Sequence, residues 1–517
     1  MSTNTGTKFN GETQIYYDVL IIGAGPAGVG AATFLAHLGV TRVLMMSKAN
    51  GTADTPRAHV TNAGTMEYRQ GTLPRERMVG TARRMENYHT MSPSKHLEIP
   101  QTYVEPILLK EATKHGITAR FDTEFLTLAE DADGVTTQLR DCLTGATYSV
   151  RSKFVICADG GQSAVMKHLG IPMHIASTGA LAINVLFKCD LTEFSHTRRS
   201  LIIHTFLAEM PGPAWGLFGA FRPIKLLKEW LGVLVSSPQG EKERPTPEII
   251  QDSYNLAWKI AYVLQGKAGL GLLDTYSVER QPIRVGIIKR ANDGFRTYGK
   301  LRAALGFHEP GLSPEEAAVQ ARAAAVELKE ASERGKERKS MWRDALESGD
   351  KVLNAFGIEM NHLYNSTAVW LADEVEEPVR PKDLLMEHIP STYPAFDVLI
   401  QFWVLAGMAE HAHPDPRPHF HAGKGAFALF TGIGGDAWHL AAQAVAQRLG
   451  IDINVFSIGY GQEHTDLYDE WVERRGVEDD GAVLVRPDRS FAWRLNVSPG
   501  IGAEAKLEEV LRRVLSL

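Results

Sequence analysis

The most regular hydrophobic pattern of the chain lies near its N-terminus. Val19 to Ile22 is a continuous apolar run rich in β-branched residues, which predicts a strand that is buried on both faces. Small and apolar residues then recur at helical spacing from Pro26 to Leu38, and Arg42 to Met46 is a second apolar run. These three segments predict one β-α-β unit. The polar residues 1 to 14 before it predict a disordered tail.

The next part of the chain changes from a helical to an alternating pattern. Gln101 to His115 has helical spacing. The stretches Ile117 to Leu128, Gly134 to Asp141 and Ala146 to Val150 read as three antiparallel strands. Phe154 to Ala158 is again an apolar run, which predicts another buried strand.

The C-terminal third contains helices and then a mixed pattern. Ser313 to Arg334 predicts a helix in which Ser313 is the N-cap, Pro314 occupies the first helical position and Glu316 completes a capping box. After Ala426 the pattern alternates between strands and helices, which predicts a small α/β domain. Its predicted strands are Phe427–Phe430, Ile453–Ile458, Ala482–Arg486 and Ala492–Arg494, and its predicted helices are Asp436–Leu449, Thr465–Glu473 and Gly502–Leu515. Because this part contains no cysteine, dithiol redox chemistry is excluded there.

Three glycines mark the turn inside the β-α-β unit. Gly23 permits a sharp turn, Gly25 lets a pyrophosphate approach the backbone, and Gly28 lets the helix lie close to the sheet. The helix N-terminus offers free N–H groups and a positive dipole end to phosphate. The acid that holds the ribose of NAD, expected about 20 residues further on, is replaced by Ser47 and Lys48. The turn therefore predicts dinucleotide binding, with a weaker case for NAD.

Composition narrows the class of protein. A length of 517 residues predicts two or three domains, and the net charge of −6 gives no electrostatic reason to expect nucleic acid. The three cysteines form no CxxC motif and no secretory leader is visible, so the cytoplasm is the expected compartment. No apolar run reaches the ~18 residues that a membrane span needs.

For several other candidate functional residues, the sequence also allows a purely structural role. Arg57 follows Pro56 in a loop, where a solvated residue and a phosphate or flavin ligand are equally favoured. Glu279 and Arg280, after a turn expected at Leu272–Tyr276, favour a structural ion pair over catalysis. Tyr254, Trp258 and Tyr262 recur at helical spacing, which favours a helix face in the core.

Four histidines lie close together in the sequence, but their spacing fits no closed zinc site, so no metal site is predicted. They are His411, His413, His419 and His421.

Several segments together resemble one family. The glycine turn, TPRAHVTN around Arg57, IPQTYVEPIL around Gln101, ADGGQS from Ala158 and IQDSYNLAWKIAYVLQGKAGLGLLDTYSVERQPI from Ile250 are similar to the FAD-dependent aromatic hydroxylases with the p-hydroxybenzoate hydroxylase fold. The phenol and chlorophenol monooxygenase branch resembles the chain best. Members of that branch often lack the ribose acid and carry a thioredoxin-like C-terminal domain, which TGIGGDAW and GVEDDGAVLVRPDRSFAW resemble.

The resemblance implies an α/β fold with three parts. These are a Rossmann-like FAD-binding domain, a shortened β-sheet substrate domain with its strands between Ala182 and Val235, and a thioredoxin-like α/β domain. The implied boundaries are 15–175 for the first part of the FAD domain, 176–245 for the substrate-domain remnant, 246–345 for the return helices and 382–517 for the C-terminal domain.

The same resemblance implies the cofactor contacts. Gly23, Gly25 and Gly28 would contact the FAD pyrophosphate, Arg57 and Gln101 would hold phosphate or ribityl groups, and Asp159 would serve both FAD and NAD(P)H. The full set of implied cofactor-binding residues is Gly23, Gly25, Ala27, Gly28, Ser47, Lys48, Arg57, Gln101, Asp159 and Gly160. No catalytic side chain is implied, because the cofactor performs the difficult step.

One family motif is missing. A Gly-Asp pair and a proline-rich loop, which in the family fix the ribityl chain and cover the flavin, should precede Ile250, but the chain there reads SPQGEKERPTPEIIQDSY. Two explanations stay open, a truncated or mispredicted reading frame and a real divergence.

The resemblance implies a monooxygenase that hydroxylates a phenolic or polyketide-type aromatic compound with FAD, NADPH or NADH, and O₂. A homodimer is a candidate assembly. The alternative is a catalytically impaired or truncated relative that acts as a binding or interaction protein.

Overall fold

The computed structural model describes most of the chain, in segments that are separated by gaps. They are residues 7–9, 12–56, 60–61, 97–172, 182–190, 203–206, 215–225, 228–236, 249–306, 313–353, 358, 362–374, 425–465 and 470–517. The loop residue Arg57, the four histidines from His411 to His421 and much of the linker before the C-terminal domain lie outside them.

A seven-stranded mixed sheet forms the N-terminal domain. Its strands are β1 (Thr7–Phe9), β2 (Glu12–Ile22), β3 (Val43–Met46), β6 (Thr118–Arg120), β7 (Thr123–Asp131), β8 (Gly134–Asp141) and β9 (Thr147–Cys157). The order is β6-β3-β2-β9-β8-β7, with β1 paired to β2. β6, β3, β2 and β9 run parallel, whereas β8 and β7 continue the sheet as antiparallel strands. The predicted Rossmann-like β-α-β unit is confirmed as β2, α1 (Pro26–His37) and β3.

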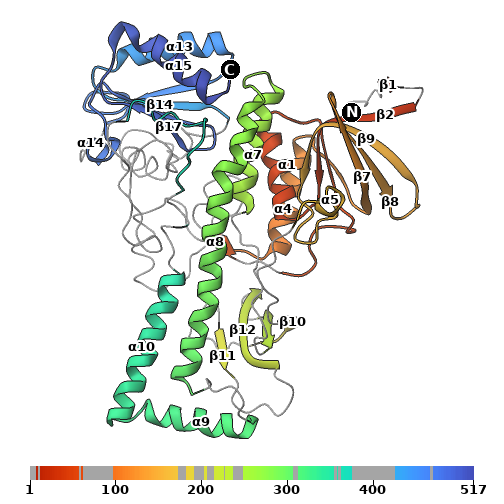
Figure 1. Ribbon diagram of the computed structural model, residues 1–517, viewed down its shortest axis with the longest axis vertical. Helices are drawn as coiled ribbons and strands as arrows, with labels where there is room; N and C mark the ends of the chain where they lie inside the picture. Colours follow the sequence, from red (N-terminus) through yellow and green to blue (C-terminus); the bar gives the residue numbers. More distant parts are fainter. Residues whose placement is uncertain are drawn as a thin grey trace.

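The central strand is buried on both faces, as its apolar run predicts. Val19 and Ile21 pack with α1, α4 (Gln101–Lys114) and α7 (Ile249–Leu264). Leu20 and Ile22 face the other side, where Val165 of α5 (Ala164–His168) completes a second core. Figure 1 shows α1, α4 and α7 side by side next to this sheet. The strand alternation thus separates two hydrophobic layers.

The helix predicted over Ser313–Arg334 ends at Glu327, and the next helix starts at Glu333. Three segment boundaries predicted for the N-terminal domain were also wrong. The expected single strand at Ile117–Leu128 is split into β6 and β7, because Asp122 adopts φ 47° and turns the chain. The two strands expected on either side of residues 151–153 are one strand, β9, because its partners overlap: β8 pairs with residues 147–152 and β2 with residues 150–157. The expected disordered tail contains β1, which pairs with residues 12–14 of β2.

A second sheet lies apart from the first. Its four antiparallel strands are β10 (Ala182–Lys188), β11 (Ile203–Phe206), β12 (Trp215–Lys225) and β13 (Glu229–Ser236), in the order β10-β13-β12-β11. They confirm the sheet predicted between Ala182 and Val235. A short two-stranded sheet of β4 (Val60–Thr61) and β5 (Leu97–Glu98) is also present.

Long helices connect the sheets. α8 (Gly271–Ala304) has 34 residues and runs lengthwise through the molecule, with α9 (Pro314–Glu327) and α10 (Glu333–Leu353) returning beside its lower end (Figure 1). The turn expected at Leu272–Tyr276 is wrong, since those residues belong to the first turns of α8. The predicted capping box is confirmed: the Glu316 N–H donates to Ser313 Oγ (3.3 Å), and the Ser313 N–H donates to Glu316 Oε2 (2.8 Å).

The C-terminal domain is a small α/β unit. Its elements are β14 (Phe427–Thr431), α13 (Asp436–Leu449), β15 (Ile453–Ser457), α14 (Glu470–Arg475), β16 (Ala482–Val485), β17 (Phe491–Leu495) and α15 (Ala503–Val514). In the order β15-β14-β16-β17, only the β14–β15 pair is parallel. A β-α-β half followed by an antiparallel hairpin and a helix is the predicted thioredoxin-like arrangement.

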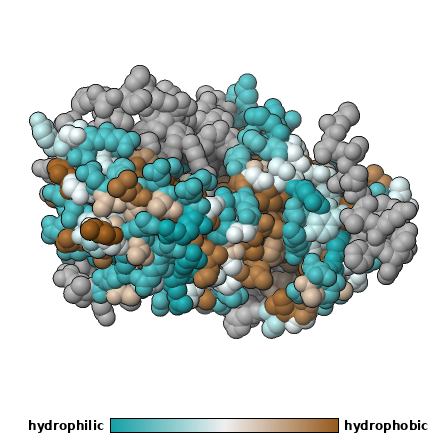
Figure 2. Space-filling view, turned by 90° about the horizontal axis from the view of Figure 1, so that it is seen from above, coloured by the Kyte–Doolittle hydropathy of each residue, from teal (hydrophilic) through white to brown (hydrophobic). Residues whose placement is uncertain are grey.

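The stripe on α7 is confirmed as a core face. Tyr254, Trp258 and Tyr262 are buried, and the last two pack into the C-terminal domain. Seen from above, the described surface is mostly hydrophilic with patches of hydrophobic side chains between (Figure 2). Among the described residues, no helix combines the length and apolarity that a membrane span requires.

Candidate cofactor site

Three predicted site residues follow three adjacent parallel strands. Gly23 comes directly after β2, Ser47 after β3 and Asp159 just after β9. The Gly23 N–H donates to Met46 O (2.8 Å), and the Ala158 N–H donates to Ile22 O (2.7 Å). The carboxyl ends of these strands therefore meet at one edge of the sheet. Open α/β sheets bind their ligands at such an edge.

The glycine turn has little room behind it and open space in front. Gly23 has φ +111°, and an added Cβ would lie 2.2 Å from Ala158 O. At Gly28 an added Cβ would lie 1.9 Å from Gly23 O. An added Cβ at Gly25 meets no atom within 4 Å among the described residues. Gly23 and Gly28 are therefore required by the backbone packing, whereas Gly25 keeps a space clear.

That space lies at the N-terminus of α1. Gly25 is the N-cap and, within the described part of the chain, provides no side-chain cap hydrogen bond, while Pro26 occupies the first helical position. The first-turn amides and the positive helix end therefore point to the space that Gly25 leaves. A diphosphate supplies the negative charge and acceptor oxygens that such a helix end binds. The residues present thus fit the pyrophosphate of FAD.

Strand β9 is followed by the capped helix α5. Asp159 Oδ2 accepts hydrogen bonds from Ala164 N (2.7 Å) and Val165 N (3.2 Å), which caps α5. Gly160 has φ +83° and is exposed. The acid is thus held at the site edge by a local helix cap, and its contact with a cofactor stays a prediction.

The residues that replace the ribose acid lie at the end of β3. Ser47 is joined through its backbone to Arg120 O and Thr123 N, both at 2.9 Å. Lys48 Nζ pairs with Glu124 Oε1 of β7 (2.8 Å), and the Lys48 side chain is 73% exposed. The structure therefore places the Lys48 charge in a surface ion pair, so its predicted cofactor contact would require this pair to open.

Gln101 makes a contact that its sequence position does not reveal. Its Nε2 donates to Glu105 Oε1 (2.6 Å), one turn along α4. The buried Glu105 also accepts from Ala53 N (2.6 Å) through Oε2. The loop that leads to Arg57 is thereby tied to α4. The signal that could have identified Glu105 is its i, i+4 spacing from Gln101.

α7 lies parallel to α1, and both begin at the site edge. Ser253 Oγ donates to Ala27 O (3.0 Å), and Gln265 Nε2 donates to Leu38 O (2.8 Å), so the contacts run in the same order along both helices. The chain that enters α7 at Ile249 therefore arrives beside the glycine turn. No sequence signal identifies Ser253, because 226 residues separate it from Ala27.

A buried charge network joins α7 and α8 to the C-terminal domain. Glu279 accepts from Lys259 Nζ (2.7 Å) and from Arg486 Nη1 (2.7 Å), and the side chains of all three are 0% exposed. Arg486 also donates through Nε to Asp488 (2.9 Å). Arg280 instead donates to Asp252 (2.7 Å). Glu279 and Arg280 therefore both form buried ion pairs, but the predicted pair between the two residues is wrong.

Because of this network, the stability of the folded protein depends on pH in the acidic range. Burial acts to raise the pKa of Glu279, but the charges of Arg486 and Lys259 outweigh it and hold the pKa well below the ordinary 4.5. Below pH 4.5 the unfolded chain therefore binds a proton at this residue that the folded protein does not, and stability falls as the pH falls. We expect the thermal midpoint of the wild type to drop more steeply between pH 4.5 and 3.5 than that of Glu279→Gln. The exposed Glu337→Gln variant, measured by the same scans, should keep the wild-type slope; equal slopes in all three would contradict this origin.

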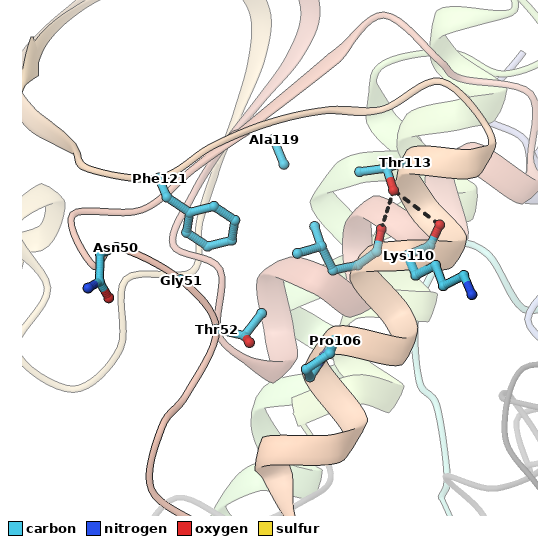
Figure 3. A pocket seen from close by; sticks show the side chains of 9 residues that line it. Asn50, Gly51, Thr52, Pro106, Lys110, Thr113, Ala119 and Phe121 are labelled. Carbon is cyan, nitrogen blue, oxygen red and sulfur yellow. Dashed lines mark hydrogen bonds between the residues drawn. The ribbon is translucent and has the colours of Figure 1, made fainter.

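A pocket of about 560 Å³ lies outside this site. Figure 3 shows it between the loop after β3, the outer side of α4 and strand β6. The Thr113 hydroxyl there donates to Leu109 O (2.9 Å) and Lys110 O (3.1 Å) of its own helix. None of its nine lining residues belongs to the glycine turn, so the pocket is separate from the phosphate site.

Comparisons with known proteins agree with this geometry. The FAD binding domain family matches residues 16–248 and 249–291, and the family described as aromatic-ring hydroxylase, C-terminal, matches residues 409–516. The chain is 33% identical to 2,4-dichlorophenol 6-monooxygenase of Cupriavidus pinatubonensis, with 96% of each chain covered. It is also 33% identical to phenol 2-monooxygenase of Pseudomonas sp., over 92% of this chain and 89% of that protein.

A solved structure shares the whole fold. The flavin-dependent monooxygenase PieE, crystallised with FAD and substrate, superposes with a TM-score of 0.83 at 29% identity, covering 97% of this chain and 99% of that one.

The family match has a break at the place where the missing motif was expected. The alignment with the Cupriavidus relative runs over 590 positions, more than the 517 residues of this chain, so the relative has segments that this chain lacks. The family match ends at residue 248 and resumes at 249, with no residue of this chain between. The Gly-Asp pair was expected at this break. Helix α7 begins at the first residue after it, beside the glycine turn.

Near-complete coverage at 33% identity, together with the two family matches, establishes the relationship. This chain belongs to the FAD-dependent aromatic-ring hydroxylases.

Proposed function

We propose that this chain binds FAD and uses NADPH or NADH with O₂ to hydroxylate a phenolic or polyketide-type aromatic compound. The observation that carries the proposal is the clear space at Gly25, in front of the α1 N-terminus and between the ends of β3 and β9. The substrate class is supported by relatives named for phenol, dichlorophenol and aklavinone hydroxylation.

The residues of the chain would divide the work between binding and positioning. The first-turn amides of α1 would bind the pyrophosphate, Asp159 and Gly160 would approach the cofactor from the end of β9, and Ser47, Lys48, Arg57 and Gln101 would contact its remaining polar groups. When bound, the flavin supplies electron transfer from NAD(P)H and the activation of O₂. Ser253 of α7 would act as a positioning residue, because it holds the Ala27 carbonyl and with it the first turn of α1.

The proposal is tested with the purified full-length protein. We expect one FAD per chain in a visible absorbance titration, NADPH oxidation that rises when a phenol is added, and a hydroxylated product in mass spectrometry. The reason is that the phosphate-binding edge is formed in this fold without any further segment. A protein that takes up no FAD would overturn the proposal.

The alternative of a binding or interaction protein is a separate hypothesis, and it concerns the break in the family match between Glu248 and Ile249. A chimera with the Cupriavidus segment inserted there separates the two functions. If only the chimera forms hydroxylated product while both proteins bind FAD, the chain is a cofactor-binding relative whose chemistry requires the absent segment.

The compartment and assembly stay predictions from the sequence. We propose the cytoplasm and a homodimer, and light scattering of the purified protein measures the assembly directly.

A further inference from the structure

Three side chains with metal-binding atoms meet where α1 and α4 end. His37 is the last residue of α1, Glu111 lies in the last turn of α4, and His115 is the C-cap of α4. One ligand atom from each lies within 4.8 Å of the other two. We infer that His37, Glu111 and His115 form a binding site for a divalent transition metal of the zinc class.

The distances suit a small tetrahedral ion. His37 Nε2 lies 3.3 Å from Glu111 Oε1, and His115 Nε2 lies 3.0 Å from the same oxygen. In a tetrahedral zinc site with bonds of about 2.0–2.1 Å, neighbouring ligand atoms are about 3.3 Å apart. An ion can therefore enter between these atoms after only small side-chain movements. Two imidazoles and one carboxylate leave a fourth position for water.

The backbone already holds the three ligands in place. Glu111 and His115 are spaced i, i+4 and so lie on one face of α4. The Thr33 hydroxyl of α1 donates to Leu108 O of α4 (3.1 Å), within a buried interface between the two helices. The imidazole rings of His37 and His115 are in edge contact, with centroids 5.0 Å apart. The three side chains therefore need little further ordering when the metal ion binds, which favours affinity for the ion.

The local charges also favour a cation. The C-terminal ends of α1 and α4 converge here, and each carries partial negative charge. Glu111 places its carboxylate between the two imidazoles. Lys114 is the opposing positive charge.

This site is remote from the phosphate site. α1 separates His37 from the glycine turn by 12 residues, about 18 Å of helix. The three side chains are between 26% and 41% exposed, so the ion is reachable from solvent. A bound metal would therefore fasten the ends of α1 and α4 together and stabilise the FAD domain.

The test compares zinc binding among variants of the full-length protein after dialysis against a chelator. Calorimetry with ZnCl₂ should show one equivalent in the wild type that is lost, or weakened by at least about tenfold, in His37→Gln, His115→Gln and Glu111→Gln, since even outer-shell substitutions at metal sites cost that much. Zn²⁺ should also raise the thermal midpoint of the wild type and not of these variants.

The matched control is His168→Gln, another exposed histidine at a helix end, whose Nε2 lies 2.9 Å from Leu128 O. It should keep the wild-type stoichiometry and the zinc-induced rise. The comparison is needed because the chain has 18 histidines. Equal zinc stoichiometry and affinity in the wild type and all three ligand variants would overturn the inference. Glu111→Gln conserves side-chain volume, so it tests the site even where a histidine variant folds poorly.

Discussion

Replacing Gly25 with valine should abolish tight FAD binding while the protein still folds. The Gly25 backbone has φ −74° and ψ −176°, which valine adopts readily, and an added Cβ meets no described atom within 4 Å. The new side chain would instead fill the space in front of the α1 amides. Losing two hydrogen bonds to a charged phosphate, at about 1.5–3 kcal/mol each, weakens binding by at least about 100-fold.

The measurement is an FAD titration followed by flavin absorbance, together with the thermal midpoint of the FAD-free protein. Gly286→Val is the matched control, because an added Cβ at Gly286 in α8 also meets no atom of the described residues within 4 Å. It should bind FAD as the wild type does. Gly28→Val should fail in a different way, through loss of folded protein, since its Cβ would collide with Gly23 O. If the Gly25→Val protein binds FAD with wild-type affinity, the pyrophosphate does not bind at this position.

Arg486→Met should be the most destabilising single substitution of a charge in the described network. Arg486 is 0% exposed, donates to Glu279 and Asp488, and stacks over the rings of Trp258 and Tyr364 at 5.3 and 5.2 Å. Methionine would leave one of these two buried carboxylates without its counter-charge. Breaking a buried ion pair in this way costs about 3–5 kcal/mol.

Thermal unfolding of two further variants isolates the cause. Arg448→Met, in the same domain, removes an exposed arginine paired with Glu504 and Glu508, so it should cost at most about 1 kcal/mol. The double variant Arg486→Met with Glu279→Gln removes one charge of each sign and should recover part of the loss. If Arg486→Met and Arg448→Met lower the midpoint equally, burial of the network does not control the stability of the domain junction.

The position of the zinc-class site explains why the sequence predicted no metal. His37 and Glu111 are 74 residues apart, and only the packing of α1 against α4 brings them together. The histidines that attracted attention in the sequence, from His411 to His421, were close in sequence. Proximity along the chain is a poor guide here, because the distances among ligand atoms are set by helix packing.

Local patterns were sufficient wherever the structure depends on neighbouring residues. The apolar run Val19 to Ile22, the glycine spacing of the turn and the capping box at Ser313 depend on backbone geometry within a few residues, and all three are confirmed. The end of a strand or helix depends on its partners as well. For that reason the length of β9 was misjudged, and residues 272–276, which were expected to form a turn, are the start of α8.

The sequence by itself determined the β-α-β unit, the dinucleotide turn and the small α/β unit at the end of the chain, because each follows from periodicity and residue type over short spans. Only the tertiary structure decided that Ser253 holds the first turn of α1, that Glu279 pairs with Arg486 rather than Arg280, and that α7 begins beside the glycine turn. These contacts join residues more than 200 positions apart. Such contacts are selected by the packing of whole elements, which no local pattern encodes.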